Sequence, residues 1–368
     1  MRTAIVHDWL VSYAGAERVL EEIYKLFPSP VYALVHCKEA LKESPLSQAK
    51  VYTSFIQKLP RSTKWYRYYL PLFPMAIEDF DLSHYDLIIS SSHAVAKGVL
   101  RNAKQVHICY CHTPMRYAWD LYYQYLGSSN LSKGMKGFFA KLFLHYIRLW
   151  DYSSSQRVDY FVANSNPVAD RIRKVYGRHA EVIHPPVDVD HFDISTDRED
   201  YYITVSRLVP YKRVDLIIKA FSMQKWRKLL IVGDGPEYKK LKEIASKNIE
   251  FLGSLKNDEL KKYLMKAKAF VYMGEEDFGI AMVEAQACGI PVIAYGFGGA
   301  RDIVQDGKTG ILFYEQSEDA FLGALDHFEK KQEGFLPEKI RENAKRFSKE
   351  AFREKFKTFV DRVVNETI

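Results

Sequence analysis

The sequence predicts an α/β protein built from two similar doubly wound halves. Its 368 residues exceed what a single hydrophobic core usually organises, so two domains are expected. Short apolar runs alternate with helical segments, which is typical of a parallel sheet. The series is interrupted at residues 183–188, which contain two prolines, and then begins again.

The first half opens with a strand, a glycine-containing loop and a helix. Residues 4–6 form a short apolar run, and residues 17–27 place their apolar side chains on one helical face. This order is typical of the start of a doubly wound domain. Further strands are predicted at 31–34, 86–92, 105–111 and 160–165, with a helix at 169–176.

The second half repeats the pattern after a polar segment that reaches about residue 198, which we interpret as the linker. Strands are predicted at 202–206, 228–232, 249–253, 269–273 and 291–295, and helices at 214–221, 258–266 and 280–288. Residues 338–364 read as one or two charged amphipathic helices. The predicted domains are 1–188 and 189–349, and a C-terminal helix at 350–368 can pack back on the first.

Composition and charge narrow the classes of function. The chain is 47% hydrophobic and 27% charged, as expected of a globular protein. Residues 1–190 contain 23 Lys and Arg against 17 Asp and Glu, whereas the remainder contains 30 against 29. The positive first half suits a phosphorylated ligand or an anionic surface. No motif of a nucleic-acid-binding module is present, so nucleic acid is not an expected partner.

The cysteines and the apolar runs bear on compartment. Four scattered cysteines are too few for a disulfide framework and indicate a reducing environment. The Cys-Tyr-Cys-His run at 109–112 lacks a second ligand cluster, so a zinc site there is disfavoured. The N-terminal apolar run is too short for a signal peptide, and no run approaches the ~20 residues of a spanning helix. We expect a cytoplasmic protein.

The most informative stretch is 275–285, where Glu276 and Glu284 flank an acidic, aromatic and glycine-containing turn. An apolar strand precedes this turn and a helix follows it. Such joints lie at the carboxyl ends of parallel strands, where ligands bind. The exposed N–H groups of the helix start suit an anion. Taken alone, the stretch is equally compatible with an acidic surface turn before an amphipathic helix.

The two glutamates, separated by seven residues around Asp-Phe-Gly-Ile, resemble the paired-glutamate motif of retaining glycosyltransferases with the GT-B fold, and more narrowly glycosyltransferase family 4. Other family-like motifs of the second half are Val205–Leu208 with Lys212 five positions after Arg207, Gly233–Pro236, Phe251–Gly253, the run from 284 to 293 and Gly296–Gly299. The resemblance implies two Rossmann-like domains that face each other across a cleft.

Motifs of the first half resemble the mannosyltransferases of bacterial O-antigen and polysaccharide assembly. They are His7–Leu10, Gly15–Val19, Ser91–His93, Cys111–Tyr117 and Val162–Ser165. One position departs from the family pattern, because Ala14 stands where the loop usually has the first of two glycines. The methyl group restricts the backbone there and weakens the assignment of the donor sugar.

The resemblance assigns the donor-binding roles to the second half. We recognise no Asp-x-Asp motif for a metal, so no metal or other cofactor is expected. Arg207 and Lys212 would instead clamp the leaving diphosphate. Glu276 would hold the transferred hexose and Glu284 the ribose hydroxyls. Backbone groups complete this set: Phe278, Gly279 and Ile280 beside sugar and phosphate, and Gly253, Ser254 and Leu255 beside the base.

The first half is assigned the remaining contacts. Gly15 would let a backbone N–H approach the diphosphate. His112 would hydrogen-bond the donor sugar without acting as a base, because the leaving phosphate can take the acceptor's proton. Weaker candidates for the acceptor side are Asp8, Glu17, His93 and Lys97. For each of these four, helix capping or surface solvation is an equally good interpretation.

The implied function is retaining transfer of a hexose, foremost mannose from GDP-mannose, to a hydroxyl of a glycan or lipid-linked acceptor in surface polysaccharide synthesis. A UDP-sugar donor and a non-catalytic nucleotide-sugar binding protein on the same fold are the alternatives. Two aromatic and basic stretches, 58–80 and 133–150, suit an interfacial helix on an anionic membrane. Ordinary core helices are the competing interpretation, so a location at the inner face of the membrane is the second expectation for the compartment.

Overall fold

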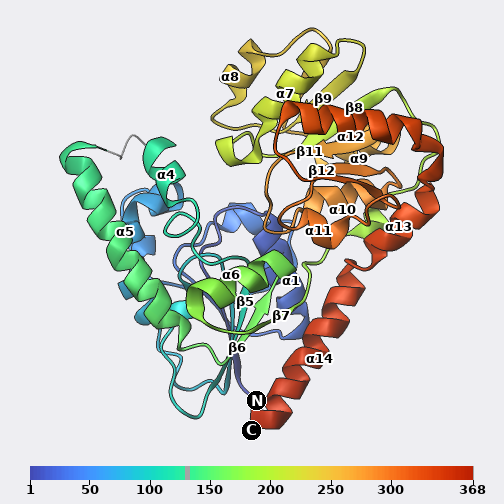
Figure 1. Cartoon of the computed structure of the whole chain (residues 1–368). Coiled ribbons are helices and arrows are strands. Elements are labelled where there is room, and N and C mark those ends of the chain that lie inside the picture. Colours follow the sequence, from blue (N-terminus) through green and yellow to red (C-terminus); the bar gives the residue numbers. More distant parts are fainter. Residues whose placement is uncertain (129–132, 368) are drawn as a thin grey trace. The chain divides into compact units, whose positions relative to one another are not determined.

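The computed structural model describes residues 1–128 and 133–367, and the chain divides into two compact units (Figure 1). The first unit comprises Met1–His184 and Phe352–Ile368, and the second comprises Pro185–Ala351. In each unit, strands alternate with helices along the chain. The prediction of an α/β protein with two doubly wound halves is therefore confirmed.

The first unit contains a seven-stranded parallel sheet. Its strands are β1 (Thr3–His7), β2 (Val31–Ala33), β3 (Val51–Thr53), β4 (Leu87–Ser92), β5 (Val106–Cys111), β6 (Tyr160–Ala163) and β7 (Ala180–Val182), in the spatial order β3-β2-β1-β4-β5-β6-β7. The central strands β4 and β5 are buried along their whole length, so β4 combines an apolar start with three buried serines at its end.

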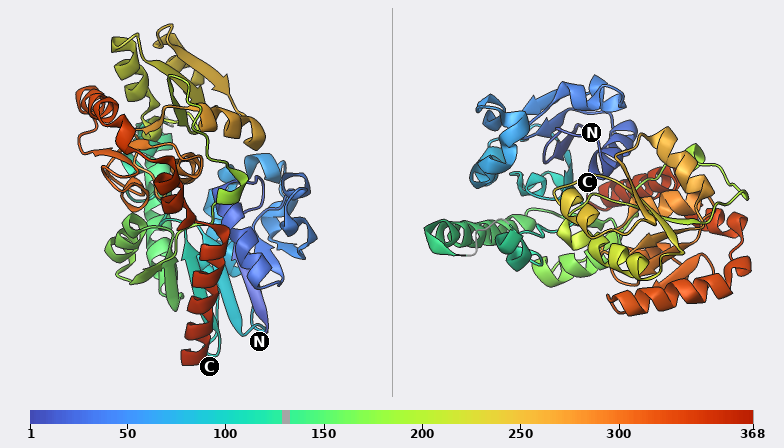
Figure 2. Two further views of the ribbon diagram at one scale, coloured as in Figure 1. Left: turned by 90° about the vertical axis from the view of Figure 1, so that its right-hand side faces the viewer. Right: turned by 90° about the horizontal axis from the view of Figure 1, so that it is seen from above.

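The helices of the first unit cover this sheet and include the C-terminal one (Figure 2). They are α1 (Gly15–Leu26), α2 (Ser62–Trp65), α3 (Phe73–Glu78), α4 (Tyr122–Ser128), α5 (Gly134–Ser155), α6 (Asn166–Tyr176) and α14 (Lys349–Thr367). Phe352, Phe356 and Phe359 of α14 join the core cluster of α1. The end of the chain thus packs against its beginning, and Figure 1 shows both termini together at one end of this unit.

The second unit contains a six-stranded parallel sheet in the order β10-β9-β8-β11-β12-β13. Its strands are β8 (Tyr201–Val205), β9 (Lys228–Val232), β10 (Ile249–Gly253), β11 (Ala269–Tyr272), β12 (Val292–Tyr295) and β13 (Gly310–Phe313). Its helices are α7 (Val214–Met223), α8 (Tyr238–Glu243), α9 (Asn257–Lys266), α10 (Ile280–Ala287), α11 (Ala300–Ile303), α12 (Glu318–Lys330) and α13 (Pro337–Lys345).

The elements that the sequence reasoning missed are mostly short and peripheral. Strands β3, β7 and β13 have three or four residues and lie at sheet edges, and runs this short show little periodicity in the sequence. Helix α12 was also missed. The charged tail proves to be two helices, α13 and α14.

The linker is shorter than predicted. The boundary between the units lies at His184 and Pro185, and the segment beyond it is part of the second unit. Val187, Val189 and Phe192 are each less than 5% exposed and belong to that unit's core. The prediction that the linker extends to about residue 198 is wrong. The three apolar residues are separated by polar residues in the sequence, so the segment looked polar although it contributes to the core.

Each sheet has one point at which the strand order reverses direction. In the first sheet the chain proceeds outward in opposite directions from β1 and β4, and in the second from β8 and β11. Where the order reverses, the connections leave to opposite sides and open a crevice at the carboxyl ends of the strands, which is where doubly wound proteins bind ligands. Among the described residues, no helix is long and apolar enough to cross a membrane.

Candidate active site

In the second unit, the reversal point brings Lys212 and Glu276 together. Lys212 ends a short 3-10 helix (η7, Pro210–Lys212) after β8, and Glu276 lies in the turn after β11. The Lys212 ammonium and the Tyr272 hydroxyl both donate hydrogen bonds to the Glu276 carboxylate. The side chains of Lys212 and Glu276 are 13% and 19% exposed, so the pair is accessible to a ligand at this edge of the sheet.

The turn that carries Glu276 depends on close backbone packing. The N–H of Gly299 donates to the Glu276 carbonyl at 2.9 Å, and a Cβ at Gly299 would lie 2.0 Å from the Phe278 carbonyl oxygen. Gly279 begins helix α10 with φ of +107°, a conformation that other residues rarely adopt. The two glycines therefore hold Glu276 and the start of α10 in place.

Glu284 lies one turn into α10, where its side chain is largely buried at 9% exposure. Ile280 is the first residue of the same helix, and Phe278 is buried beside it. The helix start and both glutamates thus belong to one rigid joint between β11 and α10. A carboxylate in that position suits hydroxyl groups that enter from the strand ends.

Four further predicted residues lie along the same edge. Arg207 follows β8 and is exposed, and its loop is packed against the loop after β9, since the Leu208 N–H donates to the Asp234 carbonyl at 3.0 Å. The Gly233 N–H donates to the Gly253 carbonyl at 2.8 Å, which ties in the end of β10. Ser254 is exposed and Leu255 half-buried. The residues that the sequence predicts to bind the donor therefore occupy consecutive strand ends from β10 to β11.

In the first unit, the reversal point is organised by Asp8, which follows β1 and is fully buried. Its two carboxylate oxygens accept hydrogen bonds from four consecutive backbone N–H groups, those of residues 93–96, at 2.6–3.0 Å. The His93 ring lies 3.1 Å away. Burial alone would raise the pKa of Asp8, but His93, His7 and the N–H donors outweigh it and lower that pKa.

A second chain of contacts connects Glu17 to His112. The Glu17 carboxylate lies 3.8 Å from the His7 ring, His7 contacts Ser91 at 3.2 Å, and the Ser91 hydroxyl hydrogen-bonds His112 at 2.8 Å. Burial holds the pKa of His112 well below its ordinary value of 6.5. His112 is consequently a neutral imidazole at pH 7, able to exchange hydrogen bonds with a sugar.

The structure places Lys97 elsewhere. Its side chain is 1% exposed, and its ammonium donates to the Asp151 carboxylate and, at 3.0 Å, to the Ala94 carbonyl. Asp151 also accepts from Trp119 and Tyr176. Lys97 is therefore bound in an internal ion pair, whereas Gly15 begins α1 at the same edge of the sheet as Asp8.

The expectation that the sequence has no Asp-x-Asp motif is wrong, because two such sequences occur, at 79–81 and 188–190. In residues 1–128 and 133–367, no group of three or more His, Cys, Asp or Glu is arranged to hold a metal ion. Cys109 and Cys111 are buried within β5. Asp188 pairs with Lys349, and the Asp81 carboxylate accepts from the Ser83 N–H at 3.0 Å.

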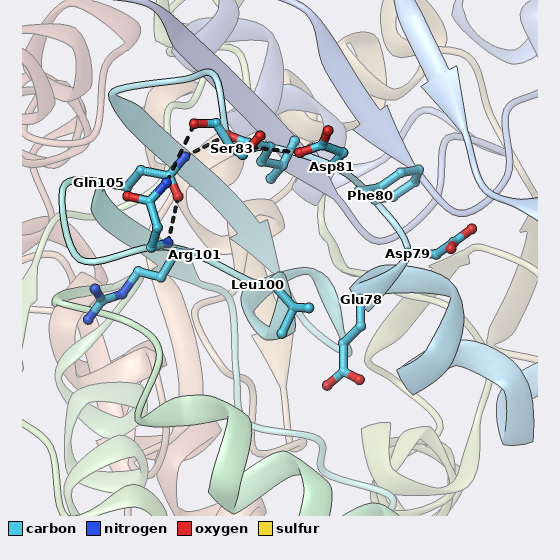
Figure 3. A pocket seen from close by; sticks show the side chains of 10 residues that line it. Glu78, Asp79, Phe80, Asp81, Ser83, Leu100, Arg101 and Gln105 are labelled. Carbon is cyan, nitrogen blue, oxygen red and sulfur yellow. Dashed lines mark hydrogen bonds between the residues drawn. The ribbon is translucent and has the colours of Figure 1, made fainter.

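A pocket of about 330 Å³ in the first unit lies away from these residues (Figure 3). It is lined by residues that precede β4 and β5, namely Glu78–Ser83, Leu100–Asn102 and Gln105. Several lining side chains are engaged within the protein: Gln105 donates to two backbone carbonyls, and Glu78 accepts from Trp150 and Arg157. The pocket is at the amino edge of the sheet, opposite to His112.

Two residues that contact the predicted site residues were not predicted to belong to the site. Tyr272 looks like part of an apolar strand, and only its hydroxyl, directed at Glu276, gives it a polar role. Ser91 was noted within a motif, but its position between His7 and His112 depends on the pairing of β4 with β1 and β5. The position of Tyr272 four residues before Glu276 at a strand end is the signal that could have drawn attention to it.

Comparison with protein families covers both units. The model described as Glycosyltransferase Family 4 matches residues 13–191, and that described as Glycosyl transferases group 1 matches residues 188–347. The chain belongs to glycosyltransferase family 4. The second match contains every donor-side residue described above, from Arg207 to Glu284.

Curated relatives resemble parts of this family 4 member. A GDP-mannose-dependent α-(1-6)-phosphatidylinositol monomannoside mannosyltransferase of Mycolicibacterium smegmatis is 32% identical over 186 residues, 42% of this chain and 49% of the relative. The N-acetyl-α-D-glucosaminyl L-malate synthase of Bacillus anthracis is 34% identical over 127 residues, 32% of each chain. The matched part is therefore about half of these relatives' length, or less.

Solved structures show the fold. The Anabaena protein HepE in complex with UDP-glucose is similar with a TM-score of 0.71 at 17% identity, over 98% of this chain and all of that one. This likeness and the two parallel sheets confirm the expected fold class, two Rossmann-like domains of the GT-B type.

Proposed function

We propose that this family 4 member is a retaining hexosyltransferase that moves mannose from GDP-mannose to a hydroxyl of a glycan or lipid-linked acceptor, in the synthesis of a surface polysaccharide. The observation that carries the proposal is the Lys212–Glu276 pair at the β8–β11 reversal point, with Arg207 at the neighbouring loop. It supplies cations for a diphosphate and a carboxylate for sugar hydroxyls at the place where doubly wound sheets bind nucleotides.

The proposed chemistry needs charge stabilisation more than acid–base catalysis. As the bond from sugar to diphosphate breaks, negative charge grows on the leaving phosphate, and Arg207 and Lys212 stabilise it. Glu276 orients the hexose, and Glu284 accepts hydrogen bonds from the ribose hydroxyls. The leaving phosphate takes the acceptor's proton, so no protein base is assigned. The two cations do the work that a metal does in other transferases.

The first unit contributes sugar and phosphate contacts in this proposal. A neutral His112, held by Ser91, donates or accepts a hydrogen bond to the transferred sugar. Gly15 provides a backbone N–H at the start of α1. Asp8, Glu17 and His93 shape the acceptor side. Lys97 is left out of this group, because its ammonium is engaged with Asp151.

The choice of mannose rests on the first-half motifs and on the named mannosyltransferase relative, and a donor panel tests it. A ligand that binds only the folded protein raises the melting temperature. We expect the largest rise with GDP-mannose and GDP. A larger rise in melting temperature with UDP-glucose and UDP would mean that the donor is a UDP-sugar and not GDP-mannose. Tight binding without release of nucleotide in the presence of any acceptor would favour a non-catalytic binding protein.

The metal-free mechanism has its own test. Release of GDP from GDP-mannose, measured with a lipid-linked or glycan acceptor, should proceed at an unchanged rate after treatment with EDTA. Loss of activity that magnesium or manganese restores would overturn this part of the proposal, while the donor panel would still report the base.

A further inference from the structure

Helix α5 of the first unit has two faces of opposite kind. The side chains that point inward are buried and include Leu144, Ile147 and Asp151. The opposite side exposes large apolar side chains, with Met135 77% and Phe138 63% exposed. The complete exposed set on α5 is Met135, Phe138, Phe139, Leu142, Tyr146, Leu149 and Tyr152.

The exposed set forms one continuous stripe. From Met135 to Leu149 its members recur every three or four residues, which places them on one side of a helix. At 1.5 Å per residue the stripe from 135 to 149 is about 21 Å long. Six large exposed apolar side chains along this length are more than the single exposed residues that ordinary protein surfaces carry.

The stripe is not the consequence of a poorly packed helix. Ile147 belongs to the core cluster of Phe73, and the indole N–H of Trp150 donates to Glu78 of α3 at 2.8 Å. Asp151 is bound to Lys97 at the buried side. The inner face of α5 is thus fixed to the unit, and the helix lies at the edge of this unit in Figures 1 and 2. The side chains on its other face are exposed.

The exposed charged side chains at the start of α5 are lysines. Lys133, Lys136 and Lys141 are exposed on or next to α5. The thirty residues from 121 to 150 contain no Asp or Glu, although the whole chain has 46 of them. Asp151 of α5 is buried and paired with Lys97, so the exposed charges named here are positive. An apolar stripe flanked by exposed lysines is complementary to a bilayer surface that carries anionic headgroups.

We propose that the outer face of α5 is a docking surface for an anionic phospholipid bilayer. The helix lies parallel to the membrane, with the stripe at the boundary between headgroups and acyl chains and the lysines among the phosphates. It does not span the bilayer, since no described helix is long and apolar enough to do so. This proposal rests on the proposed function, which includes a lipid-linked acceptor. The docking surface would bring the protein to the membrane in which such an acceptor is anchored.

A second copy of the chain is the main competing occupant. Pairing of two α5 faces would bury the stripes, but it would also bring two sets of lysines together with no carboxylate from 121 to 150 to neutralise them. A membrane with anionic lipids satisfies both the apolar and the charged parts of the surface.

Flotation of the full chain with vesicles tests the proposal. We expect binding to phosphatidylcholine vesicles that contain about one third phosphatidylglycerol, weakening as salt rises, and little binding to phosphatidylcholine alone. The double variant Phe138→Gln, Leu142→Gln should lower the vesicle affinity by at least about tenfold, because it removes apolar surface. Glutamine is a good helix former, so the helix itself should be retained. Lys136→Glu with Lys141→Glu should lower the vesicle affinity to the same extent.

Matched controls carry the same changes on exposed residues of the second unit. Met223→Gln with Trp226→Gln removes apolar surface, and Lys247→Glu with Lys339→Glu reverses charge. These should bind vesicles like the unchanged chain. Melting temperature and thermal shift with GDP establish that each variant is folded, and they keep a failure of the donor assignment distinct from a failure of membrane binding.

Two results would overturn the inference. One is unchanged vesicle binding by both α5 variants. The other is a dimer of the unchanged chain that the Phe138 and Leu142 exchange converts to a monomer while no protein floats with anionic vesicles, in which case the occupant is a second copy.

Discussion

The Lys212 ammonium donates a hydrogen bond to the Glu276 carboxylate, and this contact joins the loop after β8 to the turn after β11. These are the two strands from which the chain proceeds in opposite directions across the sheet. Each charge is the other's partner in the structure, so a ligand with phosphates and hydroxyls can engage both at once. The predictions below begin with this pair.

Glu276→Gln keeps the shape of the side chain and removes its charge. A hydrogen bond to a charged group contributes about 2 kcal/mol, so we expect kcat/KM for sugar transfer to fall at least about 30-fold. The control is Glu275→Gln, an exposed neighbour with the same change, which should leave the rate within a factor of about two. Equal rates for both variants would mean that the site is wrongly placed.

Tyr272→Phe removes the second donor to Glu276 while the ring stays in the core, where it is 2% exposed. Loss of a hydrogen bond that contributes about 1 kcal/mol to the orientation of Glu276 predicts a roughly fivefold lower kcat/KM. Tyr201→Phe is the matched control, because its hydroxyl donates to the Tyr263 carbonyl at 2.7 Å, away from Glu276. If Tyr272 had only a structural role, both variants would melt earlier and neither would transfer more slowly.

Asp8→Asn places an amide nitrogen against backbone N–H donors and should destabilise the chain by about 3 kcal/mol at pH 7. Because the folded pKa of Asp8 is below its ordinary value of 3.8, its contribution is complete above that pH and is lost as pH falls through the folded pKa. The difference in unfolding free energy between the two proteins should therefore shrink in acid.

Denaturant unfolding between pH 3 and neutrality measures this difference. The exposed Asp319→Asn is the control and should change stability by less than about 0.5 kcal/mol across the range. A gap between Asp8→Asn and the unchanged chain that is the same at both ends of the range would contradict the assignment of a charged, hydrogen-bonded Asp8.

Lys97→Met leaves Asp151 as a buried carboxylate without its cation, at a cost of about 3–5 kcal/mol. The double variant with Asp151→Asn should recover part of this loss, because no unpaired charge remains. Below its melting temperature the folded Lys97→Met protein should transfer sugar at the usual kcat/KM. A large loss of kcat/KM without loss of stability would return Lys97 to the acceptor side.

Local patterns were enough for most of the architecture. Apolar runs such as those of β4, β5 and β11 mark central parallel strands because these are buried on both faces. The spacing of Glu276 and Glu284 around a glycine turn placed both at a strand–helix joint, and the structure has that joint at β11 and α10. Edge strands such as β3 were missed, because β3 has only three residues and two of them are exposed, so it forms no apolar run.

Contacts between residues that are distant in the sequence could be identified only from the tertiary structure. Local sequence patterns were sufficient to predict two α/β halves, the strand ends that carry Arg207, Lys212 and the glutamates, and a basic, aromatic segment at 133–150. Only the folded chain decided that Tyr272 serves Glu276, that Lys97 is buried against Asp151, and that α5 turns its apolar stripe outward. Periodicity is a local property, whereas strand order and burial arise from contacts between segments that may be anywhere in the chain.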